Sequence, residues 1–542
     1  IYDTTTSISE SATKITLDNT TATIVGAGAY EKENTITITN NGDYYITGSY
    51  IGQLVIDADD KIVHIMLDNV SITSNISAPI YIKNSKKTVI TLVNNNSISD
   101  NSNHSVDSNN EPDGCLFSDD DLTINGTGTL NINALYQDGI VSKDGLKIIN
   151  GTYNIKANDD GVRGKDYVYI KTATFSIESG MDGIKSTNDT NSDLGYILIE
   201  SGDYNIISNS DAIQAETTLQ IKDGTYNLTT GAGSTTTSVS SLWNNGDSTK
   251  SSKGLKGANN IIIDNGKFII DSEDDSIHSN NTITINQATF TISSGDDGIH
   301  ADSNITINNG DITINKSYEG VESSNITINN GSISINASDD GINVAGGNDA
   351  SSQNRPGANT NVTTTNQNLT INNGYVYISS VGDGIDVNGA IYQNGGTIII
   401  NGPSDNANGI LDFDTEFIIT QGTLIAAGSS GMLQLPTSSH INVVYASFNT
   451  MPANTLINLS TSDTSIITFA PSKSYQAIIF ATPNIKSSLS YTLSSGGEVS
   501  GTHTNGIYDG IYQGGSVIAT KTIKTTLTAF TTTNNNFNSP GR

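Results

Sequence analysis

Acidic residues return at a nearly constant interval along this sequence, each followed by a small residue and then by an isoleucine or a valine. One copy of the motif reads Asp296-Asp297-Gly298-Ile299-His300. Further copies carry their acid at Asp138, Asp160, Asp182, Asp211, Asp275, Glu319, Asp340 and Asp383. The interval is 22 residues from Asp138 to Asp160 and again from Asp160 to Asp182. Carboxylates that recur in phase could bind hard cations, because Ca²⁺ takes roughly six to eight oxygen ligands.

Stacking of these acids would be costly without a counter-charge. Two neighbouring carboxylates about 5 Å apart repel by on the order of 3 kcal/mol at an effective dielectric constant of about 20. We therefore expect bound Ca²⁺, with ligands drawn from the motif acids and their neighbours: Asp159, Asp160, Asp182, Asp274, Asp275, Asp296, Asp297, Asp302, Glu322, Asp339 and Asp340. The alternative is that each Asp accepts a hydrogen bond from a backbone N–H at a tight turn and binds no metal.

A second row of side chains lies two residues after the small residue of each motif. It reads Arg163, Lys185, Gln214, Lys256, His278, His300, Glu322, Asn343 and Asp386. We expect these side chains to point outward on one face, where basic groups beside acid-bound cations would suit an acidic sugar polymer. The candidate carbohydrate-binding residues are Arg163, Lys185, Lys256, His278, His300 and the only tryptophan, Trp243. The alternative is an ordinary solvent-exposed polar face.

The elements that position these residues are short strands. Within each period the sequence alternates apolar and polar residues and is interrupted by Asn-Gly turns, as at Asn309-Gly310 and Asn330-Gly331. Asn-Gly often marks a hairpin, but a 22-residue recurrence favours strands that pair with their own copy one period later. Ile305 and Ile307 would then stack on Ile326 and Ile328. The predicted fold is all-β, a right-handed parallel β-helix with coils of about 22 residues, capped at both ends.

The repeat also predicts how the chain is divided. We expect an N-terminal tail and cap over residues 1–33 and the β-helix over 34–435, with loop insertions near 95–113, 231–252 and 346–368. A C-terminal β cap over 436–519 and a polar tail over 520–542 would follow. The strand-like alternation from Ile518 to Phe530 could be donated to a neighbouring molecule.

Composition excludes several classes of function. A formal net charge of -30 over 542 residues argues against nucleic-acid and anionic-membrane partners, which need a basic surface. One cysteine, Cys115, allows no intramolecular disulfide. No run of about 18 apolar residues is present to form a transmembrane segment. The chain begins at Ile1 rather than Met, from which we expect a processed protein, extracellular or displayed at the cell surface.

The sequence resembles secreted carbohydrate-binding parallel β-helix proteins of the clostridial cellulosome-associated type, which are calcium-containing relatives of the pectate-lyase fold. Beside the Asp-Gly-Ile motifs, the resemblance rests on Thr35–Ile38, Tyr45–Gly48, Leu67–Thr73, Lys253–Lys256 and Gly346–Asp349. It implies calcium between coils and the binding of a cellulose-like or acidic pectin-like polysaccharide. The motif departs from the family pattern at Ala212, Gly254 and Ser276.

Three functions follow from these observations. The leading one is a non-catalytic, calcium-stabilised polysaccharide-binding protein of the cell surface or the extracellular space. One alternative is a subunit of an extracellular filament, assembled as a homo-polymer end to end or by strand donation. The other is a calcium-dependent polyuronate lyase, in which Lys185 or Arg163 would be the base that removes the C5 proton of the uronate.

Overall fold

The computed structural model describes residues 3–235, 251–345 and 367–531. These residues form two compact units, Ile1–Asp296 and Asp297–Arg542. Strands dominate both units, and the one helix among the described residues is the short 3₁₀ segment η1 (Gly233–Thr235). The prediction of an all-β protein is confirmed.

In the first unit, three strands form a repeating set. The strands β14 (Asp138–Ser142), β15 (Gly145–Ile148) and β16 (Thr152–Ala157) are followed by β17 (Val162–Gly164), β18 (Tyr167–Ile170) and β19 (Ala173–Ser179). Each strand pairs in parallel with its counterpart, so that Ile140 faces Val162, Leu146 faces Val168 and Ile155 faces Ile177. This is the pairing that the repeat predicts for a parallel β-helix, and it excludes the hairpin reading of the Asn-Gly turns.

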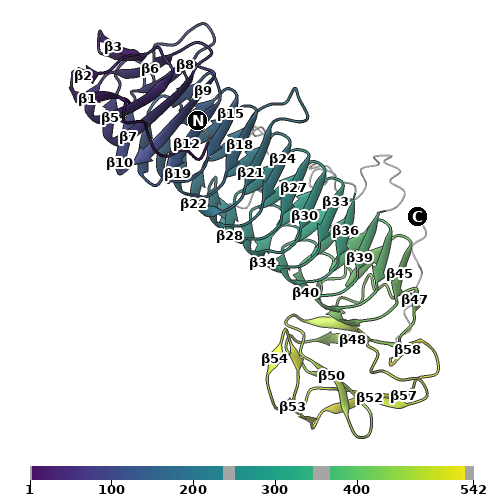
Figure 1. Cartoon of the computed structure of the whole chain (residues 1–542). Helices are drawn as coiled ribbons and strands as arrows, with labels where there is room; N and C mark the ends of the chain where they lie inside the picture. The colour runs from purple at the N-terminus through teal and green to yellow at the C-terminus, as the bar shows by residue number, and fades with distance from the viewer. Residues whose placement is uncertain (1–2, 236–250, 346–366, 532–542) are drawn as a thin grey trace. The chain divides into compact units, whose positions relative to one another are not determined.

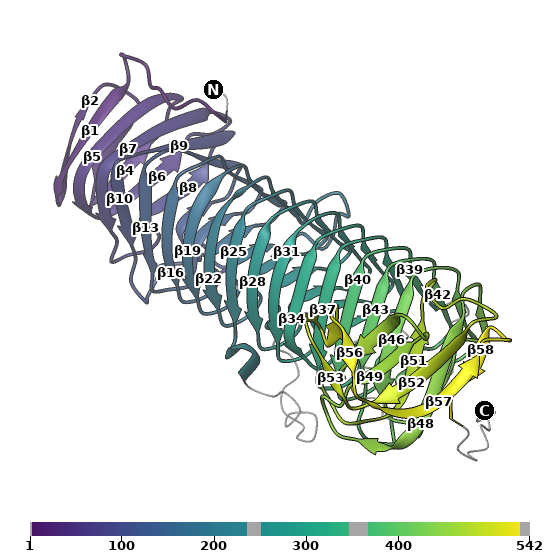
Figure 2. The same cartoon turned by 90° about the horizontal axis from the view of Figure 1, so that it is seen from below.

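The same three series run through the rest of the first unit (Figures 1 and 2). The series that carries the Asp-Gly-Ile motif continues through β20 (Ile184–Ser186), β23 (Ile213–Ala215), β26 (Leu255–Gly257) and β29 (Ile277–Ser279). The second continues through β21 (Tyr196–Ile199), β24 (Thr218–Ile221), β27 (Asn260–Ile263) and β30 (Thr282–Ile285). The third continues through β22 (Gly202–Ser208), β25 (Thr225–Thr230), β28 (Lys267–Ser272) and β31 (Thr289–Ser294).

Stacked apolar side chains fill the interior of the first unit. Alternate residues of each strand are buried, since successive side chains point to opposite faces of a strand. In the third series the buried positions carry a column of rings: Tyr153, Phe175, Tyr204, Tyr226, Phe268 and Phe290. Neighbouring ring centroids in this column lie between 4.5 and 5.6 Å apart. Such contacts stabilise beyond the area they bury, so this column holds the third series in register.

The second unit is built in the same way. Its motif series comprises β32 (Ile299–Ala301), β35 (Val321–Ser323), β38 (Ile342–Val344), β41 (Ile385–Val387) and β44 (Leu411–Phe413). The other two comprise β33 (Asn304–Ile307), β36 (Asn325–Ile328), β39 (Asn368–Ile371), β42 (Ala390–Gln393) and β45 (Glu416–Ile419), and β34 (Asp311–Ser317), β37 (Ser332–Ala337), β40 (Tyr375–Ser380), β43 (Thr397–Asn401) and β46 (Thr423–Gly428). Ile305 pairs with Ile326 and Ile307 with Ile328, as predicted.

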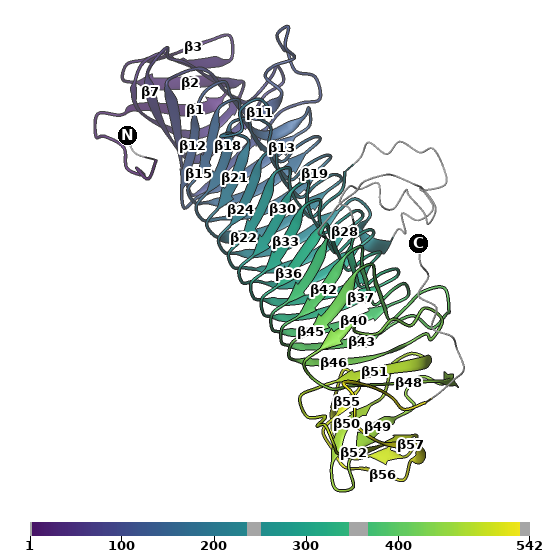
Figure 3. The same cartoon turned by 90° about the vertical axis from the view of Figure 1, so that its right-hand side faces the viewer.

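Different pairings occur near each end of the chain. Near the start, β1 (Thr13–Asn19) pairs antiparallel with β2 (Thr21–Val25) and parallel with β5 (Gly42–Ile51). In the second unit β51 (Tyr475–Ala481) runs antiparallel to β46 (Figure 3). Because β51 reverses the strand direction, the parallel series that contains β43 and β46 ends at β46.

Two sequence expectations about loops were wrong. The segment 95–113 was expected to lack strands, yet it begins with β10 (Asn95–Ser99), whose Ile98 pairs with Ile132 of β13 (Thr129–Ala134). The segment 520–542 was expected to be a polar tail, yet β58 (Leu527–Ala529) lies within it and pairs with β48 (Val443–Met451) of the same chain. Phe530, which is only 3% exposed, anchors this segment. The isolated apolar residues in both segments are enough to bury a strand against a preformed sheet.

The expected insertions 231–252 and 346–368 lie mostly outside the described residues. No helix of the described part of the chain is long and apolar enough to cross a membrane.

Candidate functional site

The motif acids of the first unit form a hydrogen-bonded ladder. One carboxylate oxygen of Asp138, Asp160 and Asp182, Oδ1, accepts a hydrogen bond from the backbone N–H of the matching residue in the next repeat. The distance is 2.9 Å from Asp160 N to Asp138 Oδ1, from Asp182 N to Asp160 Oδ1 and from Asp211 N to Asp182 Oδ1. This is backbone capping of the kind weighed above as the alternative to metal binding, although it links neighbouring repeats rather than one turn.

The other carboxylate oxygen, Oδ2, binds a basic side chain. Arg163 Nη2 lies 2.6 Å from Oδ2 of both Asp113 and Asp138. Lys185 Nζ lies 2.6 Å from Asp182 Oδ2 and 3.7 Å from Asp160 Oδ2. These cations supply, around Asp160 and Asp182, the positive charge that the sequence analysis assigned to calcium.

The later acids of the first unit follow the same rule. Lys256 Nζ lies 3.2 Å from Asp211 Oδ2. Lys253 Nζ lies 2.9 Å from Asp274 Oδ2 and 2.8 Å from Asp275 Oδ2. Two clusters here still bring three carboxylates within 4.8 Å: Asp138 with Asp159 and Asp160, and Asp274 with Asp275 and Asp296. In each of these clusters at least one carboxylate already forms an ion pair with a lysine or an arginine.

Burial shifts the ionisation of these groups. Burial raises the pKa of Asp138 to about 7 although Arg163 opposes it, and burial together with Asp160 raises the pKa of Asp182 to about 6. Burial lowers the pKa of Lys185, but Asp160 and Asp182 outweigh that effect and the net pKa is raised. A raised pKa keeps the ammonium of Lys185 protonated at neutral pH, whereas a general base must be free to accept a proton.

The candidate carbohydrate-binding residues do not form one exposed row. Side chains of Arg163, Lys185 and Lys256 are 22%, 25% and 22% exposed, and all three are engaged in the ion pairs above. The expectation that His278 and His300 face solvent is wrong, because they are 2% and 1% exposed. Buried neighbours hold the His278 ring: Nδ1 lies 2.8 Å from Asp275 Oδ2 and Nε2 lies 2.9 Å from Asn280 Oδ1.

The remaining candidate, Trp243, lies outside the described residues.

In the second unit a histidine lies among acids. His300 Nδ1 is 3.3 Å from Asp297 Oδ2 and 3.6 Å from Glu322 Oε2, and its Nε2 is 3.5 Å from Asp302 Oδ1. Ligand atoms of Asp297, His300 and Glu322 all lie within 4.8 Å of one another, and the three side chains are buried. Next to them, burial and the charge of Glu322 raise the pKa of Glu319 well above its ordinary value.

The next acids of the second unit form a cluster of a different kind. Asp340, Asp383 and Asp386 also bring carboxylate oxygens within 4.8 Å of one another. Burial, together with repulsion by neighbouring aspartates, raises their pKa values to about 9, 6 and 7. Among the residues that the structure describes, no lysine, arginine or histidine forms an ion pair with any of these three acids. Lys316 and Arg355 are the only lysine and arginine in the sequence between residues 297 and 430.

Two carboxylates pack against the backbone beside this cluster. A Cβ atom at Gly382 would lie 2.3 Å from Oδ1 of both Asp339 and Asp340. Asp339 therefore lies next to Asp340 at a position that only glycine permits, and Asp340 in turn belongs to the cluster with Asp383 and Asp386. Oxygen-only ligands of high negative charge are those that Ca²⁺ prefers, so the residues present fit a bound calcium ion. Asp339 and Asp340 were predicted as ligands, whereas Asp383 and Asp386 were not.

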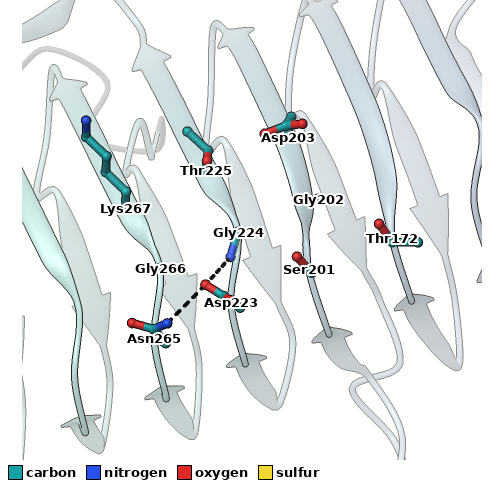
Figure 4. Close-up of a pocket in the computed structure, with 10 residues that line it drawn as sticks. All are labelled: Thr172, Ser201, Gly202, Asp203, Asp223, Gly224, Thr225, Asn265, Gly266 and Lys267. Atoms are coloured by element: carbon teal, nitrogen blue, oxygen red, sulfur yellow. Dashed lines mark hydrogen bonds between the residues drawn. The ribbon is translucent and has the colours of Figure 1, made fainter.

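A shallow polar groove lies elsewhere on the first unit, across the turns that lead into β22, β25 and β28 (Figure 4). Its volume is about 480 Å³. The lining residues are Thr172, Ser201, Gly202, Asp203, Asp223, Gly224, Thr225, Asn265, Gly266 and Lys267. None of these residues was predicted as a site residue, although the turn at Asn265-Gly266 is visible in the sequence.

Comparison with known proteins gives one family. A family model described as a carbohydrate-binding domain-containing protein matches residues 32–298 and 297–341. A curated protein of Acetivibrio thermocellus with the same description is 35% identical over 150 residues, which are 27% of this chain and 50% of that protein. The chain thus spans about half the length of the curated relative that it matches.

Among solved structures, the polysaccharide lyase-like protein from C. thermocellum, a gadolinium derivative, is 32% identical with a TM-score of 0.40. The match covers 41% of this chain and 92% of that one.

Proposed function

The chain belongs to the family of carbohydrate-binding domain-containing proteins, and we propose that it is an extracellular or cell-surface protein that binds polysaccharide without cleaving it and is stabilised by calcium. The observation that carries the proposal is the family match over residues 32–341, which is more than half of the 542 residues. A net charge of -30 suits a solvent-exposed binding role, since repulsion between like charges opposes aggregation.

The proposed calcium ion has its best ligands in the second unit. Asp339, Asp340, Asp383 and Asp386 would hold it. Its charge would oppose the burial and the repulsion that raise the pKa values of Asp340, Asp383 and Asp386. The buried group of Asp297, His300 and Glu322 is a second candidate site, although one imidazole makes it a poorer match for calcium, which prefers oxygen ligands.

The absence of catalysis is proposed from the state of the two residues that a lyase would need. Arg163 and Lys185 are held in short ion pairs with buried acids, and the pKa of each is raised. Neither side chain is therefore available as a base. The groove of Figure 4 contains carboxylates, but among its lining residues no acid forms a hydrogen bond or ion pair with a base.

Co-sedimentation with insoluble polysaccharides tests the binding. The protein is mixed with cellulose, and separately its mobility is followed in gels that contain soluble neutral glycans or polygalacturonate, each with calcium and with a chelator. We expect retention on at least one polysaccharide and no ultraviolet absorbance from the unsaturated product that a lyase would form. Product formation that is lost in Lys185→Ala would instead identify a lyase, and no retention on any polysaccharide would overturn the proposed function.

A further inference from the structure

Three consecutive repeats of the first unit lack a side chain at the same position. The position is occupied by Gly202, Gly224 and Gly266. Each of these glycines comes directly before one of the residues Asp203, Thr225 and Lys267, which pair with one another across neighbouring strands. Their φ angles are 140°, 131° and 127°, in the region that favours glycine. Ala173 faces Gly202 from the repeat before, and Ala288 precedes Thr289, the partner of Lys267, in the repeat after. Because an alanine side chain occupies the equivalent position in the repeat before and in the repeat after, the groove ends at both of these repeats.

Two rows of polar side chains form the walls of this groove. Asp203, Thr225 and Lys267 project from the strand side, and Thr172, Ser201, Asp223 and Asn265 lie along the turns (Figure 4). In the described part of the chain, the side chains of Asp203, Thr225 and Lys267 make no hydrogen bond or ion pair, and all three are exposed. They are thus free to exchange hydrogen bonds with a ligand.

The floor of the groove is rigid. Tyr204 and Tyr226 lie beneath it, and their hydroxyls donate hydrogen bonds to the carbonyl oxygens of Ser201 (3.1 Å) and Asp223 (2.9 Å). A Cβ atom at Gly224 would lie 2.9 Å from the hydroxyl of Tyr226, so the ring column closes the groove from below. The turns are fixed before any ligand arrives, which reduces the entropy that binding must overcome.

The chemistry of the walls selects the kind of ligand. Hydroxyl, carboxylate, amide and ammonium groups together can donate to and accept from sugar hydroxyls. Asp203 and Asp223 outnumber the single cation Lys267 in the lining, and like charges brought together disfavour a wrong partner. A polyuronate would bring one carboxylate per sugar against this wall and against a chain of net charge -30.

The distance between successive repeats in the groove also matches the length of a sugar unit. Stacked strands lie about 4.8 Å apart, which is close to the length of one pyranose unit in an extended β-1,4-linked chain. Each repeat can therefore present its wall residues to a successive sugar. We propose that this groove binds one chain of a neutral, extended polysaccharide whose axis runs across the repeats. This inference rests on the proposed function and names its site and its ligand class.

A rival surface lies on the outward face of β18 and β21. Tyr167 and Tyr196 stack there with ring centroids 5.3 Å apart, and the ring of Tyr167 lies against Gly145, where a Cβ would approach it to 2.3 Å. Stacking on a sugar needs an open ring face. Both faces of Tyr167 are covered, so this pair is the weaker platform.

Calorimetric titration of the full chain tests the groove. The probes are cellohexaose, xylohexaose and mannohexaose as neutral oligosaccharides, and hexagalacturonate as the charged one. The variants are Asp203→Ala with Lys267→Ala, and Thr225→Tyr, which fills the groove with a residue that strands accept. We expect the wild type to bind at least one neutral probe, and both variants to bind it at least tenfold more weakly, or about 1.4 kcal/mol.

Three control variants, Thr291→Tyr, Lys171→Ala and Tyr196→Ala, locate the loss. Thr291→Tyr on β31 and Lys171→Ala alter exposed residues outside the groove, and we expect both to bind as the wild type does. An unchanged melting temperature shows that the variants are folded. Wild-type affinity in the groove variants, loss only in Tyr196→Ala, or binding of hexagalacturonate alone would overturn the inference while the proposed function stands. Failure of the wild type to bind any probe or any insoluble polysaccharide would overturn both.

Discussion

Four motif aspartates of the first unit, Asp138, Asp160, Asp182 and Asp211, use their two carboxylate oxygens for different contacts. Oδ1 caps a backbone N–H of the next repeat, while Oδ2 binds a basic side chain, as at Asp182 with Asp211 N and Lys185. The cap fixes the position of the carboxylate, and the cation then removes the cost of its buried charge. Removing the cation alone should therefore be more damaging than removing an exposed ion pair.

Arg163→Gln tests this at one residue. Asp113 and Asp138 would lose their shared guanidinium, and breaking a buried pair from one side costs about 3 to 5 kcal/mol. We expect a fall of that order in the free energy of unfolding, measured by urea denaturation. The matched control is Lys156→Gln, which breaks a pair with Glu178 whose side chains are both 64% exposed, and which should cost less than about 1 kcal/mol. If the two substitutions lowered the free energy of unfolding equally, burial would add nothing to the stabilisation that the Arg163 ion pairs provide.

The raised pKa values of Asp340, Asp383 and Asp386 in the second unit predict how the free energy of unfolding depends on pH. Their folded pKa values, about 9 for Asp340, 7 for Asp386 and 6 for Asp383, lie above the ordinary aspartate value of about 3.9. The folded chain thus holds protons that the unfolded chain releases first. In metal-free buffer the free energy of unfolding should fall as the pH rises from about 4 to about 9.

Calcium should cancel that fall, because it binds the ionised carboxylates. At a concentration 100 times its dissociation constant it should add about 2.7 kcal/mol, and the gain should be larger at pH 8 than at pH 5. Urea denaturation at both pH values, with and without calcium, measures this. A metal-free stability that rises from pH 5 to pH 8 would contradict the raised pKa values.

At the scale of strands, the sequence predicts most of the architecture. The period of two and the recurrence near 22 residues both reflect constraints that act along the chain, so Ile305 and Ile307 could be paired with Ile326 and Ile328 without a structure. The strand β58 could not, because its pairing with β48 depends on a sheet more than 70 residues earlier.

Side-chain contacts between repeats were harder to predict than the strands. Arg163 was visible in the outward row, but its reach back to Asp113 and Asp138 depends on how the long side chain packs across two repeats. Asp383 and Asp386 were likewise visible as residue types. Only the folded structure, which brings their carboxylate oxygens within 4.8 Å of that of Asp340, marks them as candidate ligands.

The aromatic column predicts which strand contacts matter most. Phe268 stacks between Tyr226 and Phe290, with centroids 4.5 and 4.6 Å away. Phe268→Ala should cost about 3 to 5 kcal/mol through the lost burial and the cavity, and Phe268→Leu should cost less. Chemical denaturation gives both values. A cost for Phe268→Ala below about 1 kcal/mol would mean that the column does not hold β25, β28 and β31 together.

For the molecule as a whole, the two β-helical units differ in which cations offset the negative charge of their motif acids. The first unit carries its own cations at the motif series, namely Arg163, Lys185, Lys253 and Lys256. The second unit has no such pair at Asp340, Asp383 and Asp386 within the described ranges, and we propose that a calcium ion takes that place. Calcium should therefore stabilise one unit and leave the other unchanged.

Hydrogen exchange followed by mass spectrometry, with saturating calcium and with a chelator, tests this claim most directly. The account predicts that calcium slows exchange in peptides covering β38, β41 and β44, and leaves exchange in β14, β17 and β20 unchanged. Slower exchange in β14, β17 and β20, or no change in either unit, would contradict it.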